Sequence, residues 1–213
     1  KNKDNPWLKS CQNKGMFLLI GDASDFSLLE NAGLKRARGL IATTDDDGTN
    51  IEIAMQVKNN RRGLVGNTFH CLVHSTDPLL CKLVNDQIID LGDPSVQIKL
   101  FNVYELGARR MLQVYPAWQE VNDQCARILL IGLGRFGQEL LVQMARTWWN
   151  FRDDHEKKLY VTIVDRNAQE NFDILLGRHP QLSEAVEFDI FTMEVESSSF
   201  ESGKVFAKNR PDI

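Results

Sequence analysis

Short apolar runs alternate along the chain with longer segments whose apolar residues recur every three or four positions. The short runs predict strands, and the three- and four-residue spacing predicts helices. In the segment 45–60, for example, Ile51, Ala54, Met55 and Lys58 fall on one helical face. The predicted strands lie at 16–23, 39–44, 68–75, 96–102, 127–134, 159–165 and 186–195. The predicted helices lie at 5–15, 26–34, 45–60, 77–88, 103–115, 136–149 and 168–185, the last ending in a loop.

The predicted strands are almost continuously apolar, and helices separate them. Strands of this kind are buried on both faces, which is typical of a parallel sheet covered by helices. The sequence therefore predicts an α/β protein with a Rossmann-like parallel sheet and helices on both faces.

A weak internal repeat divides the chain into two modules. A shift of 172 positions places residues 18–41 on residues 190–213, with strand, polar break, short helix and next strand in the same order. We assign the first module to residues 1–121, with the helix at 103–115 as a crossover, and the second to 122–213. The first lacks a glycine-rich turn before Met16, and the second stops before its fourth strand, so we expect this chain to be a piece of a larger protein.

Composition narrows the possible environments and partners. The 213 residues carry a net charge of −4 and no lysine- or arginine-rich tract, so no nucleic-acid partner is expected. No apolar run approaches the roughly 18 residues of a membrane span, and no signal peptide is visible. The four scattered cysteines are interpreted as reduced thiols of a cytoplasmic protein.

The stretch RILLIGLGRFGQELL, residues 127–141, contains the pattern G-x-G-x-x-G between a strand and a helix. Gly132 permits a tight turn, Gly134 lets the backbone approach a pyrophosphate, and Gly137 allows close packing of helix on strand. The N–H groups at the start of the helix then face the phosphates. The alternative is a tight turn that binds nothing.

Asp165 ends the next strand, where a carboxylate accepts hydrogen bonds from a ribose diol. It repels a 2′-phosphate, which favours NAD or an adenosine nucleotide over NADP, although Arg166 is placed to meet such a phosphate. Arg135 either reaches a phosphate, of its own or of a neighbouring subunit, or is solvated. The predicted nucleotide site of the second module comprises Gly132, Gly134, Arg135, Phe136, Gly137, Asp165 and Arg166.

Two segments carry a family resemblance. Residues 21–58, GDASDFSLLENAGLKRARGLIATTDDDGTNIEIAMQVK, resemble the N-terminal domain of Trk-type potassium-uptake regulators, also called the RCK, KTN or TrkA-N domain. The segment IGLGRFGQEL resembles the nucleotide-binding turn of the same family. The resemblance covers most of the chain as two tandem partial modules.

The resemblance implies a Rossmann-like domain that binds NAD(H), ATP or ADP without reacting with it. It further implies homo-oligomers that control a potassium channel or transporter, as a cytoplasmic part at the inner face of the membrane. Carried over by position, Gly21 and Asp22 lie beside the adenine or ribose of the first module, and Thr43, Thr44 and Asn50 line the turn after its fourth strand. In the second module Met193 and Glu194 replace the Gly-Asp pair. The two partial modules, taken from neighbouring chains, could together form one six-stranded sheet, so that each supplies the strands that the other lacks.

Other candidate chemistry has simpler explanations. Asp45, Asp46 and Asp47 precede a helix, where carboxylates cap its N-terminus, and we favour capping over metal binding. His70 and His74 lie about 13 Å apart on one strand face, too far for one metal ion, so no metal site is predicted.

The alternative function is an NAD-dependent oxidoreductase. Such an enzyme needs a proton donor near the nicotinamide. The chain has no Tyr-x-x-x-Lys pair and no G-x-x-x-x-G-K-[ST] loop, which favours a regulatory, non-enzymatic domain.

Overall fold

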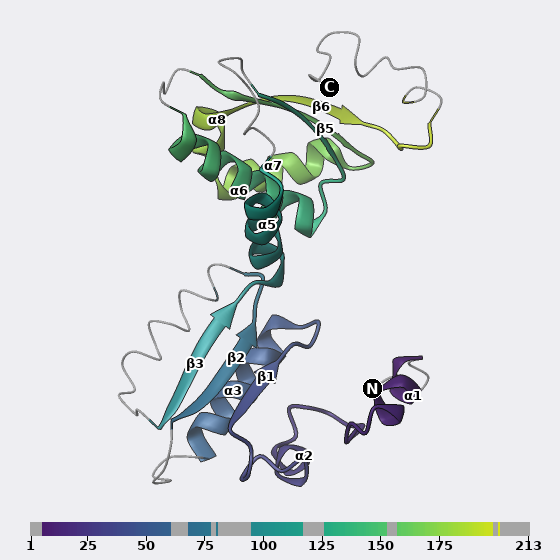
Figure 1. Ribbon diagram of the computed structural model, residues 1–213, viewed down its shortest axis with the longest axis vertical. Helices are drawn as coiled ribbons and strands as arrows, with labels where there is room; N and C mark the ends of the chain where they lie inside the picture. Colours follow the sequence, from purple (N-terminus) through teal and green to yellow (C-terminus); the bar gives the residue numbers. More distant parts are fainter. Residues whose placement is uncertain are drawn as a thin grey trace. The chain divides into compact units, whose positions relative to one another are not determined.

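The fold comes from a computed structural model that describes residues 6–60, 68–77, 80, 95–116, 126–152, 157–197 and 200. The chain divides into two units, Lys1–Asn102 and Val103–Ile213. Each unit is an α/β assembly built on its own parallel three-stranded sheet flanked by helices, which confirms the predicted α/β fold with parallel strands (Figure 1). The predicted module boundary at residues 121 and 122, and most of the predicted helix at 77–88, lie outside the described residues.

The first unit contains the sheet β1-β2-β3, in which the strands are parallel and neighbours in chain order. Residues on one face of the sheet are apolar and buried: Phe69, Cys71 and Val73 of β2 are at most 2% exposed and pack with Val57 of α3. The intervening residues of β2 face the other way and are more exposed. The elements are α1 (Trp7–Asn13), α2 (Phe26–Asn31), β1 (Gly39–Ala42), α3 (Asp47–Asn60), β2 (Phe69–His74) and β3 (Val96–Phe101).

The second unit contains the parallel sheet β4-β5-β6, with α6, α7 and α8 on one side of it (Figure 1). Its core is larger, and Leu141 of α6, together with Leu159 and Ile163 of β5, is fully buried there. The elements are α5 (Val103–Val114), β4 (Arg127–Ile131), α6 (Arg135–Phe151), β5 (Leu159–Asp165), α7 (Ala168–Arg178), α8 (Leu182–Ala185) and β6 (Val186–Thr192).

One predicted strand does not form. Residues 16–20, the apolar start of the expected strand at 16–23, have no regular secondary structure, and Phe17 is 77% exposed. The segment has strand-forming residues, but a strand also needs a neighbour with which to exchange backbone hydrogen bonds. The described part of the first unit places no strand beside it. The prediction of a strand here is therefore wrong for this structure.

The described helices include none that is both long and apolar enough to cross a bilayer.

Candidate functional site

The glycine turn between β4 and α6 is built from backbone groups. Gly132 has φ of +92°, a left-handed conformation that favours glycine, and its N–H donates to the Val164 carbonyl at 2.8 Å. Gly137 is buried, and a Cβ atom there would collide with the Gly132 carbonyl oxygen. The first helical turn thus presses directly on the end of the strand.

Gly134 is placed differently from the other two glycines. A Cβ atom built on it meets nothing within 4 Å, so the space above its backbone is open. It is the N-cap of α6, and no described side chain caps that helix end. The first intrahelical bond runs from the Gln138 N–H to the Gly134 carbonyl at 2.9 Å. Because the first N–H groups of any helix lack intrahelical acceptors, this end of α6 can bind an anion.

Asp165 is drawn into the turn by hydrogen bonds. Its Oδ2 accepts from the Leu133 N–H at 2.7 Å, and its Oδ1 accepts from the Asn167 N–H at 2.7 Å. The side-chain amide of Gln138 donates to the Leu133 carbonyl at 3.1 Å, which fixes the same residue from the other side. The structure therefore brings the predicted ribose-binding carboxylate to the glycine turn, across the ends of neighbouring strands.

Leu133 and Gln138 contribute to this site through interactions that the motif does not specify. The hydrogen bonds of Leu133 use its backbone atoms, so the amino-acid sequence does not indicate them. The Gln138 side chain reaches Leu133 only because the turn brings the two residues together.

The remaining predicted residues of this site lie on the surface. Arg135 is exposed, and Phe136 is 41% exposed and lies against Gly107 of α5, where a Cβ atom would come within 3.2 Å of its ring. The Arg166 side chain pairs with Glu194 at 3.9 Å, with both side chains well exposed. Glu194, which follows β6, thus lies beside the residue predicted to meet a 2′-phosphate.

In the first unit the corner between β1 and α3 is closed by side chains. Asn50 is completely buried: its Oδ1 accepts from the N–H and Oγ1 of Thr44 at 2.7 and 2.8 Å. Its Nδ2 donates to the carbonyls of Thr44 and His74 at 3.0 and 3.1 Å. Asn50 therefore joins the ends of β1 and β2, whereas the neighbouring Thr43 is exposed.

Of the three predicted capping carboxylates, Asp46 bonds to the start of α3, whereas Asp47 bonds to the segment after β2. The Asp46 Oδ1 accepts from the Thr49 N–H at 2.6 Å, and hydrogen bonds from Thr49 lower the pKa of this carboxyl. Burial opposes ionisation of Asp47. Hydrogen bonds to its Oδ2 from Thr76, Ser75 and the Asp77 N–H nevertheless outweigh burial and lower its pKa. The described residues contain no cluster of ligands able to hold a metal ion.

Gly21 and Asp22 lie in the loop before α2. The Asp22 Oδ1 accepts from the N–H and Oγ of Ser24 at 3.1 and 2.7 Å. A Cβ atom at Gly21 would come within 2.8 Å of the flexible end of Leu28. The loop is exposed, and its local hydrogen bonds hold the carboxylate next to the chain.

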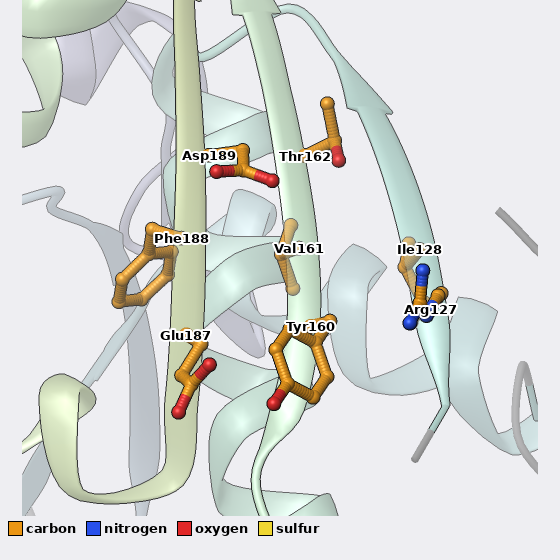
Figure 2. Close-up of a pocket in the computed structure, with 8 residues that line it drawn as sticks. All are labelled: Arg127, Ile128, Tyr160, Val161, Thr162, Glu187, Phe188 and Asp189. Atoms are coloured by element: carbon orange, nitrogen blue, oxygen red, sulfur yellow. The ribbon is translucent and has the colours of Figure 1, made fainter. Parts of the chain in front are cut away.

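A separate shallow hollow of about 100 Å³ lies over the other end of the second sheet (Figure 2). It is lined near the start of the strands, where the Arg127 guanidinium lies 5.6 Å from the centre of the Tyr160 ring. The glycine turn follows the opposite end of β4, so this hollow is no part of the predicted nucleotide site.

Comparison with known proteins identifies one domain family. Residues 2–70 match the TrkA-N domain. The TrkA-N match confirms the resemblance seen in the first segment, and it contains Gly21, Asp22, Thr43, Thr44 and Asn50. TrkA-N domains are Rossmann-like regulatory nucleotide-binding domains of potassium transport systems. A search of curated proteins found no match.

The TrkA-N match covers less than half of the chain and ends within β2. The glycine turn at residues 132–137 lies beyond it. The function of that turn is therefore inferred from its geometry.

Proposed function

We propose that this chain is a nucleotide-binding regulatory domain, and that ligand binding at the glycine turn changes its conformation and so controls potassium transport. One arrangement carries the proposal: an uncapped helix N-terminus with open space above Gly134, beside the carboxylate of Asp165. Phosphates would bind at the helix N-terminus, and the ribose would bind the carboxylate.

The proposed ligand is NAD(H), or else ATP or ADP. Asp165 disfavours a 2′-phosphate at the ribose, and Glu194 beside Arg166 adds a second negative charge near it. NADP is therefore expected to bind more weakly than NAD.

The proposed role is sensing without chemistry on the nucleotide. A ligand shifts a conformational equilibrium when it binds one state better than the other. The partner in this proposal is the membrane subunit of a potassium channel or transporter, and the chain acts as a homo-oligomer in the cytoplasm at the inner face of the membrane. The TrkA-N match supports this assignment of partner and place.

The test is calorimetric titration with NAD, NADH, ATP, ADP and NADP, on the natural sequence and on Gly134→Asp. The variant has room for its side chain, and aspartate is a favoured N-cap, so the fold should be retained. Its carboxylate would occupy the phosphate position and repel the ligand. We expect one ligand to bind the natural sequence and the variant to bind it about 100-fold more weakly.

Gly177→Asp is the matched control, because Gly177 of α7 also has open space at its Cβ position and adds the same charge away from the turn. Equal losses in the two variants would contradict a site at the glycine turn, as would the absence of binding by every ligand. Turnover of NADH, followed by absorbance, would contradict the regulatory role and favour an oxidoreductase.

A further inference from the structure

A polar groove lies in the second unit between α5 and α6, two helices that pack against each other (Figure 1). The two helices meet near Gly107 and Phe136 and continue side by side. Toward their C-terminal halves a groove of about 550 Å³ opens between them, with Leu112 and Phe151 among its apolar lining. Every described lining residue belongs to this one unit.

The groove presents hydrogen-bond donors and positive charge from both helices. Arg109 lines it from α5, and Arg146 and Asn150 line it from α6. No described lining residue carries a carboxylate. Arg109 contacts Glu105 at 2.6 Å through one nitrogen, but a guanidinium has five N–H donors in all. The groove is thus rich in donors that suit an anion.

Gln143 gives a second and independent indication of a ligand. It lines the groove and is only 5% exposed, and its side-chain nitrogen is buried without a hydrogen-bond partner among the described residues. A buried donor with no acceptor is unfavourable. The nitrogen is enclosed where it stands, so rotation of the amide by 180°, which exchanges its nitrogen and oxygen, is needed before its N–H group can meet a ligand in the groove.

The electrostatic surroundings also favour an anion. Burial lowers the pKa of His179, and the positive charges of Arg146 and Arg178 lower it further, as expected where cationic groups gather. The C-terminus of a helix carries about half a negative charge and repels anions, but this effect is confined to the last helical turn. Arg109 lies five residues before Val114, the last residue of α5, and Arg146 lies five residues before Phe151, the last residue of α6. Each arginine carries a full positive charge.

We propose that this groove binds a small phosphate-bearing anion that bridges α5 and α6. Hydrogen-bond donors that approach from two helices suit a tetrahedral oxyanion, whose oxygens point in several directions. A planar carboxylate can instead bind two parallel N–H groups of a single arginine. The site is separate from the glycine turn, and the inference does not depend on the proposed nucleotide function.

The test is an NMR titration with inorganic phosphate at constant ionic strength, following the side-chain amide of Gln143. We expect a saturable shift, and we expect Arg146→Gln to weaken binding about tenfold. Arg178→Gln is the matched control, because it removes the same charge near His179 without removing a groove-lining residue. It should bind phosphate with nearly unchanged affinity.

The outcomes separate this site from the glycine turn. A saturable shift that persists in Gly134→Asp would support the groove even if no nucleotide binds at the turn. Absence of a saturable shift would overturn the proposal, as would equal losses in Arg146→Gln and Arg178→Gln. Tighter binding of succinate than of phosphate would overturn the assignment to phosphate chemistry.

Discussion

The two units close the same kind of corner in different ways. In the first unit the corner between β1 and α3 is held by side chains, with Asn50 and Asp47 satisfying backbone groups of neighbouring segments. In the second unit the corner between β4 and α6 combines close backbone packing of Gly137 on Gly132 with side-chain hydrogen bonds to the backbone of Leu133, and the helix end stays uncapped. In the first corner the polar side chains are hydrogen-bonded to other groups of the protein. In the second corner the N–H groups at the start of α6 receive no side-chain cap and can bind a ligand.

The largest expected effect on stability is that of Gly137→Ala, which tests the close backbone packing between β4 and α6. The new methyl group would collide with the Gly132 carbonyl, so we expect the second unit to lose about 3 kcal/mol of unfolding free energy. Native-state hydrogen exchange of β5 amides measures this loss, with β2 amides of the first unit as an internal reference.

Gly134→Ala is the matched control for this prediction. Its methyl group has open space, and we expect a loss of less than about 1 kcal/mol. Equal losses in the two variants would show that close glycine packing does not set the stability of the turn.

Asn50→Ala tests the corner closed by side chains. It removes four hydrogen bonds at a completely buried position, and we expect the first unit to lose about 2 kcal/mol. Exchange of β2 amides reports this loss. Asn60→Ala removes one exposed hydrogen bond within α3 and should cost less than about 0.5 kcal/mol. A protein unaffected by Asn50→Ala would contradict the role assigned to this side chain.

The smallest expected effect is a pH dependence of the first unit. The pKa of Asp47 is lowered in the folded state, so its stabilisation is complete above the ordinary aspartate value of 3.8 and is lost as pH falls through the lower folded-state pKa. Asp47→Asn should therefore reduce the acid sensitivity of β2 amide exchange. Asp45→Asn removes the same charge from an exposed side chain and should leave that sensitivity unchanged.

Most described strands and helices could be predicted because continuous apolar runs and helical spacing are local features. Residues 16–20 have the same apolar pattern as the other strands, but their state depends on a neighbouring strand that the pattern does not specify. The glycine turn was predictable because Gly132 needs a left-handed backbone and Gly137 a close contact of helix and strand, whereas no described residue crowds Gly134.

The details of the candidate site were less predictable. The bond from the Leu133 N–H to Asp165 joins residues 32 positions apart through a backbone atom, and no side-chain pattern indicates it. Asn50 was expected to line a ligand site, and its burial under the ends of β1 and β2 depends on how the strands pair.

Helix α6 runs from the glycine turn to the groove within the second unit. Its 17 residues begin at the glycine turn and end beside the groove that Phe151 lines. At a rise of 1.5 Å per residue the helix is roughly 25 Å long, so a tilt of about 5° at the turn moves the far end by about 2 Å. A small tilt of the helix at the turn would thus displace its groove end by about one atomic radius.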